Sequence, residues 1–305
     1  MTTERRSTRY EDLDSWPSLD VLSAVYEGQL SAVAAVRGAL PAIASAAEAA
    51  VEHLRGGGRL IYVGAGTSGR IGVQDGAELP PTFNWPDDRV VFLMAGGEGA
   101  LLRAVENAED SVDDGRVRIR EAQVGPSDVV VGVAASGTTP FTVAALQEAT
   151  ALGAQTIGLS NNAGAPILTV CTHPILVETG EEVVAGSTRM KAGTAQKIVL
   201  NLFSTLVMIR IGRVYRGLMV HMRATNAKLR RRAEIMVAQI TGCSHTAAVD
   251  ALSQADGDVK TAALIAFGVD RPFAEDILAR NDDNLRLALA DVARGPQPGG
   301  GASRG

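Results

Sequence analysis

Five short apolar runs, each followed by small or polar residues, constrain the fold of this chain more than any other feature. The runs are Leu60–Val63, Val90–Met94, Val129–Ala134, Thr156–Leu159 and Ile175–Val177. Because they are rich in Val and Ile without polar alternation, they suit strands that are buried on both faces. Stretches with helical patterning lie between several of them. This alternation predicts an α/β fold with a doubly wound, parallel, five-stranded sheet.

The rest of the sequence is divided around this core. Residues 1–16 are polar and charged and predict an N-terminal arm. Residues 17–220 are expected to form the sheet domain. This domain should begin with helices, because apolar residues of the stretch 17–54 recur at three- and four-residue steps. Residues 221–294 predict a small helical C-terminal domain, and residues 295–305 a flexible tail.

An internal repeat supports the helical C-terminal domain. Gly242–Leu252 aligns with Gly268–Leu278 at an offset of 26 residues. Two copies are too few for a solenoid, so we expect two short helix pairs in one small domain.

A long helix is predicted between Gly186 and Arg216, because this stretch has no proline and its apolar residues recur at helical spacing. Ser187 or Thr188 would cap it. Its apolar run, Ile198–Ile209, is too short to span a bilayer, so a buried helix of a protein without membrane contact is expected.

Composition excludes several classes of protein. The net charge is −5 and aromatic residues make up only 4%, which argues against nucleic-acid binding and base stacking. The N-terminus has no apolar segment of a signal peptide. Cys171 and Cys243 match no disulfide framework or metal spacing. A cytoplasmic protein without a metal site is therefore expected.

The first strand leads into a glycine-rich loop, Gly64-Ala-Gly-Thr-Ser-Gly69. Gly64 and Gly66 allow a tight turn and a close approach to a ligand. Thr67 and Ser68 add hydroxyls at the expected start of a helix, where free amide groups favour an anion. The letters also fit a dinucleotide-binding loop, but the acidic residue which that motif requires comes too late in the sequence. The two hydroxyls suit a phosphate monoester better.

The third strand leads into a similar loop, Ala135-Ser-Gly-Thr-Thr-Pro140. Thr139 and Pro140 suit the first positions of a helix, so a simple helix cap is one interpretation. However, ligands of open α/β sheets bind at the carboxyl ends of the strands, where both loops lie. Together with the first loop, Ser136, Gly137, Thr138 and Thr139 predict a pocket for one phosphorylated small molecule.

Two carboxylates stand at unusual positions. Glu78, like Asp75, falls near the C-terminus of a helix, the end that disfavours negative charge. Glu109 falls within an apolar stripe if the surrounding residues form a helix. An inward-facing carboxylate should have a raised pKa and is a candidate general acid or base. A solvated acid at Glu78 and a buried structural ion pair at Glu109 are the alternatives. The residues of the stripe are Leu101, Leu102, Val105, Ala108 and Val112.

These motifs resemble a known family. The two loops look like those of the sugar isomerase (SIS) fold, which binds phosphorylated sugars. The run Gly180–Lys197 resembles a signature shared by glucokinase regulatory proteins and N-acetylmuramic acid 6-phosphate etherases, apart from Glu181 at a usual proline position. Asp75–Thr82 and the overall length resemble the etherases more closely.

The resemblance implies an activity and a set of residues. The etherases remove D-lactate from N-acetylmuramic acid 6-phosphate by elimination and hydration, without a cofactor or metal, in cell wall sugar recycling or catabolism. Their two catalytic glutamates correspond to Glu78, expected as the acid, and Glu109, expected as the base at C2, although the roles could be reversed. Glu182 and Ser187 lie in the signature and are expected to line the pocket.

The fold also implies a homodimer, which the helix predicted after Gly186 could help to form. A phosphosugar isomerase and a non-catalytic sugar-phosphate sensor remain as alternative functions.

Overall fold

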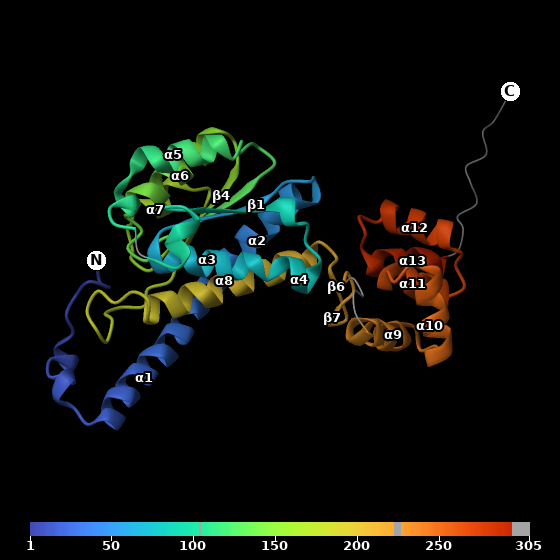
Figure 1. Cartoon of the computed structure of the whole chain (residues 1–305), viewed down its shortest axis with the longest axis horizontal. Helices are drawn as coiled ribbons and strands as arrows, with labels where there is room; N and C mark the ends of the chain where they lie inside the picture. The colour runs from blue at the N-terminus through green and yellow to red at the C-terminus, as the bar shows by residue number, and fades with distance from the viewer. Residues whose placement is uncertain (104, 223–226, 295–305) are drawn as a thin grey trace. The chain divides into compact units, whose positions relative to one another are not determined.

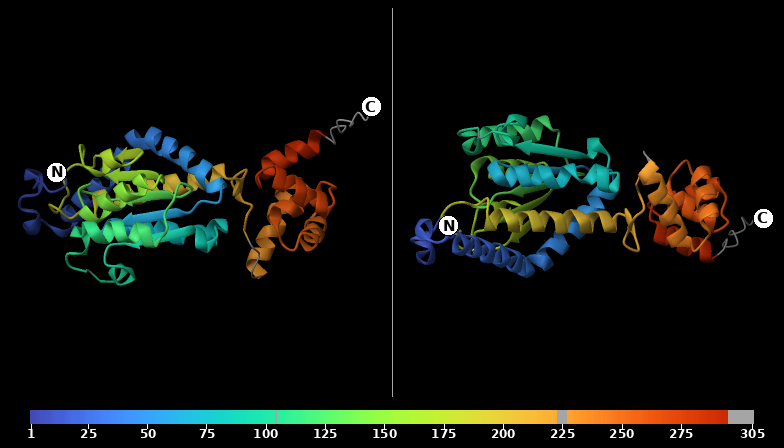
Figure 2. Two further views of the ribbon diagram at one scale, coloured as in Figure 1. Left: turned by 90° about the horizontal axis from the view of Figure 1, so that it is seen from above. Right: turned by 60° about the horizontal axis from the view of Figure 1, so that its bottom comes forward.

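The computed structural model describes residues 1–103, 105–222 and 227–294, so the tail predicted over 295–305 lies outside the described residues. The chain forms two compact units (Figures 1 and 2). The first comprises Met1–Pro80 and Trp85–Val207, and the second comprises Pro81–Asn84 and the chain from Met208 onward. The boundary expected near residue 220 stays a prediction.

The first unit contains the predicted parallel sheet. Its strands are β1 (Leu60–Gly64), β2 (Val90–Met94), β3 (Val129–Val133), β4 (Gln155–Ser160) and β5 (His173–Leu176). Their order is β2-β1-β3-β4-β5 and all neighbours are parallel. Every residue of the central strands β1 and β3 is buried. The predicted α/β fold and its five strands are therefore confirmed.

Helices cover both faces of this sheet (Figure 1). The helices α5 (Val112–Glu121), α6 (Pro140–Ala151) and α7 (Ile167–Val170) pack on one face, where their side chains join those of the strands in one apolar core. The other face is covered by α2 (Leu40–Arg55), α3 (Gly66–Ala77) and α8 (Lys191–Arg210).

Among the described residues up to Arg210, the other helical elements are α1 (Ser18–Val36), α4 (Leu79–Phe83) and six short 3-10 turns. The turns are Thr8–Tyr10, Leu13–Ser15, Arg37–Ala39, Asp87–Arg89, Glu98–Leu101 and Ala108–Asp110.

The long helix is shorter than predicted at both ends. It starts at Lys191 rather than near Gly186, whose positive φ of 73° belongs to a turn. Neither Ser187 nor Thr188 caps it. The buried Glu182 carboxylate instead accepts hydrogen bonds from the amides of Lys191 and Ala192, both at 2.9 Å. At the other end Gly212, with φ 84°, terminates the helix.

The helix predicted around Glu109 is not formed. The described residues of this segment include the 3-10 turns Glu98–Leu101 and Ala108–Asp110, and Asn107 between them has a left-handed φ of 60°. Leu102 is 92% exposed, and Val105 and Val112 are exposed as well, although Ala108 packs against the core. The helical spacing was misleading because most of the expected stripe is not covered by another described element.

The second unit confirms the internal repeat. After α9 (Ala227–Thr241), the pair α10 (His245–Gln254) and α11 (Val259–Ala266) is followed by α12 (Arg271–Arg280) and α13 (Leu285–Arg294). Ser244, Asp258, Asp270 and Asn284 each accept backbone N–H bonds at the start of these four helices. Corresponding residues of both copies thus have the same role. This unit also contains a small hairpin, β6 (Val214–Tyr215) and β7 (Leu218–Met219).

An ion pair between a buried lysine and a half-exposed aspartate joins the two copies of the repeat. The Lys260 ammonium is 1% exposed and donates hydrogen bonds to the backbone oxygen and the carboxylate of Asp283, at 2.6 and 2.7 Å. Burial alone would raise the pKa of Asp283, but the hydrogen bond from His221 and the charge of Lys260 outweigh it and lower this pKa to about 2.

Two helical stretches among the described residues, Ser18–Arg55 and Lys191–Arg210, are long and apolar enough to cross a membrane. Helices in the core of a soluble protein have the same property. The apolar window of the second is 56% buried inside the protein, in agreement with the predicted core helix.

Candidate active site

A cavity of about 420 Å³ lies in the first unit, beyond the carboxyl ends of β1 and β3. Both predicted phosphate loops contribute to it, together with the segment that carries Glu109 and with residues near both the N-terminus and the start of α8. The lining residues are Met1, Glu4, Ala65, Gly66, Thr67, Ser68, Glu109, Asp110, Ala135, Ser136, Thr138, Thr139, Pro140 and Thr188.

The first loop passes directly from β1 into α3. A Cβ atom on Gly64 would lie 2.8 Å from the Cα of Gly69, so the absence of a side chain lets the strand and the helix approach each other. Gly66 has a positive φ of 52° and no atom near its Cβ position. Its backbone, with those of Thr67 and Ser68, forms the first turn of α3, whose amides have no partner within the helix. This turn can bind an anion.

The second loop has a similar construction. Gly137 has φ 67°, and a Cβ atom there would lie 2.4 Å from the side chain of Ala165. The Ser136 hydroxyl accepts a hydrogen bond from the amide of Thr138 at 3.2 Å. Thr139 precedes α6 as predicted, but its hydroxyl makes no capping bond, and it lines the cavity. None of the described lining residues is Lys or Arg, so amides and hydroxyls are the groups available to an anion.

The segment with Glu109 is held at the cavity from both sides. Ala108 packs against the core of the sheet, and the Ser111 hydroxyl accepts the amide of Asp114 at the start of α5. The Arg70 guanidinium on α3 donates to the backbone oxygens of the preceding turn. The Glu109 side chain lines the cavity, but it is exposed rather than inward-facing. The inward-facing position expected from the stripe is therefore wrong.

Glu78 is not among the residues that line this cavity. It lies directly after α3, whose first residue, Gly66, belongs to the phosphate loop. The 12 residues of this helix separate the two points by ~18 Å. The Glu78 side chain is exposed, as the alternative of a solvated acid required.

Its neighbour Asp75 is not a solvated acid. The Asp75 carboxylate accepts hydrogen bonds from the hydroxyls of Tyr62, at 2.8 Å, and Ser204, at 3.2 Å. Burial raises the pKa of Asp75, and these two bonds and the charge of Lys197 oppose this rise only in part. Asp75 thus connects α3 to β1 and α8 near Glu78.

The two residues expected to line the pocket from the signature, Glu182 and Ser187, do not line the cavity. Glu182 is fully buried under the start of α8 and does not line the cavity. Ser187 also does not line it, but its neighbour Thr188 does. Thr188 was expected only as a possible helix cap.

The first four residues of the chain were missed altogether. Met1 and Glu4 line the cavity, although residues 1–16 read as a solvated arm. Thr3 is fully buried, and Thr2 and Thr3 bond to Asn162. No local pattern in the sequence indicates such a contact, because the partners are about 160 residues apart.

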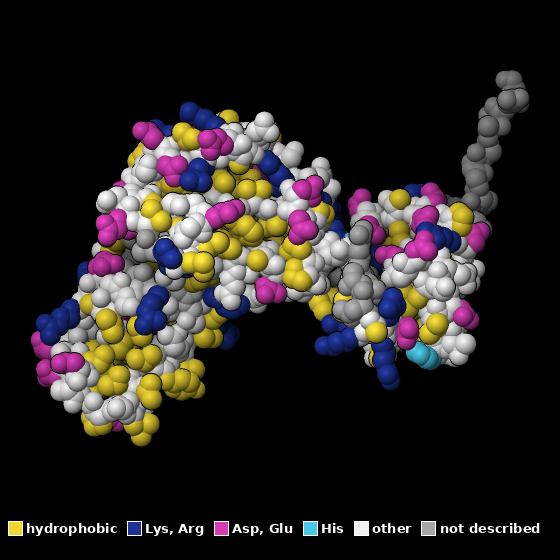
Figure 3. Space-filling view, in the orientation of Figure 1, with side chains coloured by type: hydrophobic (Ala, Val, Ile, Leu, Met, Phe, Trp, Pro, Cys, Tyr) yellow, Lys and Arg dark blue, Asp and Glu magenta, His cyan; other side chains and the backbone are white. Residues whose placement is uncertain are grey.

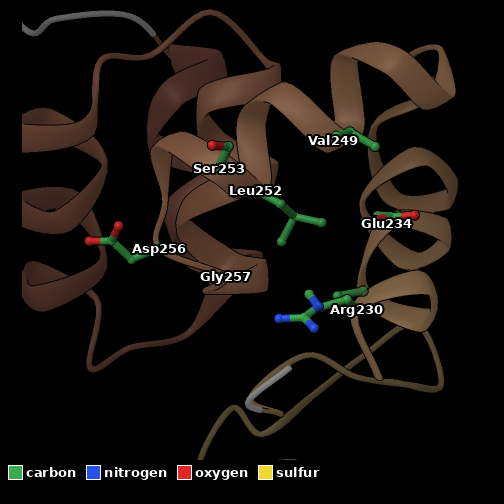
Figure 4. Close-up of a pocket in the computed structure, with 8 residues that line it drawn as sticks. Arg230, Glu234, Val249, Leu252, Ser253, Asp256 and Gly257 are labelled. Atoms are coloured by element: carbon green, nitrogen blue, oxygen red, sulfur yellow. The ribbon is translucent and has the colours of Figure 1, made fainter. Parts of the chain in front are cut away.

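A second pocket, of about 380 Å³, lies in the C-terminal unit (Figure 4). Arg230 and Glu234 reach it from α9, Val249 and Leu252 from α10, and Asp256 from the following turn. It contains none of the predicted site residues. Among the described residues, no cluster of three or more His, Cys, Asp or Glu side chains could hold a metal ion.

Comparison with known proteins first defines the class. The N-terminal SIS domain of glucokinase regulatory protein matches residues 42–150, and the SIS domain matches residues 105–206. The sheet with its two Ser/Thr loops is therefore a SIS domain.

Relatives then define the family. Proteins named N-acetylmuramic acid 6-phosphate etherase are similar along almost the whole chain. The one from Deinococcus radiodurans is 50% identical, covering 87% of this chain and 88% of its own length. Those from Halalkalibacterium halodurans and Streptomyces avermitilis are 45% and 44% identical, each covering 96% of this chain and 98% and 95% of their own. This chain belongs to the N-acetylmuramic acid 6-phosphate etherase family.

Proposed function

We propose that this protein cleaves the D-lactyl ether of N-acetylmuramic acid 6-phosphate, releasing D-lactate and N-acetylglucosamine 6-phosphate, in the recycling or catabolism of cell wall amino sugars. The observation that carries this proposal is that two Ser/Thr loops and Glu109 line the same cavity, in a chain of the etherase family.

The two loops would bind the phosphate. The amides of the first turn of α3 lie at this cavity. Five hydroxyl residues also line it: Thr67, Ser68, Ser136, Thr138 and Thr139. Such groups stabilise a dianion through hydrogen bonds and the helix dipole. Gly64 and Gly137 would act indirectly, because their missing side chains permit the close loop conformations.

The carboxylates would move protons. With the sugar ring open, the C1 aldehyde acidifies the proton at C2. Glu109 would remove it as a base, and the C3–O bond to lactate would break as an acid protonates the leaving oxygen. Water would then add at C3: Glu78, now ionised, would take a proton from the water, and protonated Glu109 would return a proton to C2. Each such proton transfer typically contributes 10² to 10⁴ to the rate.

Glu78 is proposed as the acid, contributed by a second copy of the chain. Within one chain the ~18 Å length of α3 separates it from the phosphate loop. A sugar 6-phosphate is much shorter than this, so Glu78 cannot reach the substrate bound in its own cavity. In a two-fold homodimer, each copy could supply Glu78 to the cavity of the other.

One face of α1 is suited to join the two copies. Its apolar residues recur at helical spacing and are half or more exposed in the single chain (Figure 3). They adjoin an apolar groove that includes Trp16, Val183 and Val184, and this groove is continuous with the loop that leads to Thr188. Such a face normally marks a protein interface. Its residues are Leu19, Leu22, Tyr26, Leu30 and Val33.

We place this reaction in the cytoplasm. A sugar phosphate carries two negative charges and does not cross a lipid bilayer unaided. Both described cysteines are free thiols, as is usual in a reducing compartment.

The test is release of D-lactate from N-acetylmuramic acid 6-phosphate by the purified protein in H₂¹⁸O. We expect unlabelled lactate and one ¹⁸O atom at C3 of the sugar, because the C3–O bond breaks and water adds there. Label in the lactate would contradict elimination. A protein that binds the sugar phosphate without releasing lactate would instead be a sensor, and one that only interconverts aldose and ketose would be an isomerase.

A further inference from the structure

We propose that the N-terminal segment Thr2–Glu4 is a wall of the substrate pocket and that Glu4 binds the sugar part of the substrate. This inference rests on the proposed function for the identity of the sugar. It concerns a segment outside the SIS domain, and it assigns Glu4 a role in substrate specificity.

The segment is fixed by one buried side chain. Asn162, 4% exposed, follows β4 and accepts hydrogen bonds from the amide of Thr2 at 2.7 Å and from its hydroxyl at 3.0 Å. Its Nδ2 donates to the hydroxyl of Thr3 at 3.0 Å and to the backbone oxygen of Ala135 at 2.9 Å. Ala135 opens the second phosphate loop, so one amide group joins this loop to the N-terminal segment.

A second contact joins the segment to the other side of the pocket. The amide of Gly186 donates to the backbone oxygen of Thr3 at 3.2 Å. Gly186 has a positive φ of 73°, and a Cβ atom there would lie 3.0 Å from Oε2 of Glu4. The Glu4 carboxylate therefore lies beside the loop that carries Thr188. Thr3 is completely buried between these contacts, whereas Glu4 is exposed and lines the cavity.

The charge of Glu4 indicates which part of the substrate it contacts. A carboxylate repels a phosphate dianion, and the phosphate already has two loops of amides and hydroxyls. The sugar carries hydroxyl and amide N–H donors, for which an ionised carboxylate is the strongest acceptor among side chains. Glu4 is therefore placed to accept a hydrogen bond from the sugar.

Substitution of Glu4 separates this role from a structural one. In Glu4→Ala we expect KM for N-acetylmuramic acid 6-phosphate to rise about tenfold or more, with kcat changed less than about threefold. Glu4→Gln keeps a neutral acceptor and should give an intermediate KM. Glu11→Gln is the matched control, because Glu11 is an exposed acid of the N-terminal residues 1–16 that does not line the cavity. A Glu4→Ala protein with the KM of this control would overturn the proposal.

Calorimetry with two ligands gives a second, independent readout. Glu4→Ala should bind N-acetylglucosamine 6-phosphate about tenfold more weakly, whereas inorganic phosphate should bind as well or better, because a repulsive charge has been removed. Equal weakening for both ligands would show a general disturbance of the pocket and contradict a contact to the sugar. If the wild-type protein released no lactate, the proposed activity would fail, but this comparison would still test Glu4.

The anchor is tested by Thr3→Val, which keeps the shape of the side chain but removes the hydroxyl acceptor of Asn162. We expect the same rise in KM with a nearly unchanged kcat. Thermal unfolding should show that the protein remains folded, because the variant loses a single hydrogen bond near the end of the chain. An unchanged KM in this variant would refute the role of the anchor.

Discussion

Activity of mixed dimers should reveal whether Glu78 acts across a subunit boundary. Glu78→Gln and Glu109→Gln each remove one proposed catalytic carboxylate. Because ~18 Å of helix separates Glu78 from the phosphate loop of its own chain, the Glu109 of one copy should work with the Glu78 of the other. A dimer of one chain of each variant then has one site with both glutamates and one site with neither.

The size of the effect follows from this geometry. Each variant alone should lose about 10² to 10⁴ in kcat. Random mixing makes half of the dimers mixed, and one of the two sites in each mixed dimer is intact, so about a quarter of the wild-type activity should return. Co-expression with two different tags and purification on both would isolate the mixed dimer, which should have about half of the wild-type lactate release.

The opposite result has an equally clear signature. If both glutamates served the cavity of their own chain, every site of the mixed dimer would lack one of them, and activity would stay at the level of the parent variants. The reciprocal control pairs wild-type chain with the double variant Glu78→Gln/Glu109→Gln. A shared site predicts an inactive mixed dimer in this case, whereas sites within single chains predict half of the wild-type activity. Activity in this control would refute the shared site.

Three further predictions concern stability. Glu182→Gln should lower the free energy of unfolding by about 1–3 kcal/mol, as measured with urea, because the buried carboxylate accepts two amides of α8. Gly137→Ala should cost about 1–3 kcal/mol because of its positive φ and its close neighbours, whereas Gly125→Ala, with nothing within 4 Å, should be nearly neutral in the same assay. The Asp283 pKa of about 2 lies below its ordinary 3.8, so its contribution to stability is complete above about pH 4 and is lost as pH falls toward 2. Asp283→Asn should lower the urea midpoint at pH 7 and flatten that acid dependence, because Lys260 loses its counter-charge; an unchanged pH profile would contradict the assignment.

The parts of the structure that depend on local sequence could be predicted. Buried strands read as uninterrupted Val- and Ile-rich runs, and the glycines of the two loops stand where the backbone needs them, as the φ of 67° at Gly137 shows. The C-terminal repeat was visible because Gly242–Leu252 and Gly268–Leu278 align at an offset of 26 residues, and the capping positions Ser244 and Asp270 correspond in this alignment. In each case the physical cause lies within a few residues of the signal.

The segment around Glu109 shows where this reasoning fails. Apolar spacing alone predicted a helix, but spacing contains no information on whether another element covers the apolar face. Leu102 is almost fully exposed, and the left-handed Asn107 interrupts the segment. Glu109 nevertheless lines the cavity, because hydrogen bonds fix the backbone on both sides of it. Arg70 binds the preceding turn, and Ser111 caps the start of α5. The catalytic role of Glu109 stays a prediction.

The contacts of the N-terminal segment could not have been predicted from composition. In a polar stretch, nothing in the sequence distinguishes a residue that becomes buried, such as Thr3, from one that stays exposed, such as Glu4. The position of this segment depends on Asn162, a residue that only the folded sheet brings near. The position of Glu78, by contrast, follows from the length of α3, a helix whose end near Glu78 the sequence did indicate. The sheet thus supplies the phosphate loops from one continuous chain, whereas the groups proposed to contact the sugar, Glu4, Glu109 and Glu78, come from separate segments. Because the reaction takes place at C2 and C3 of the sugar, changes in those segments should alter which sugar reacts, while changes in the two loops should weaken binding of every sugar phosphate alike.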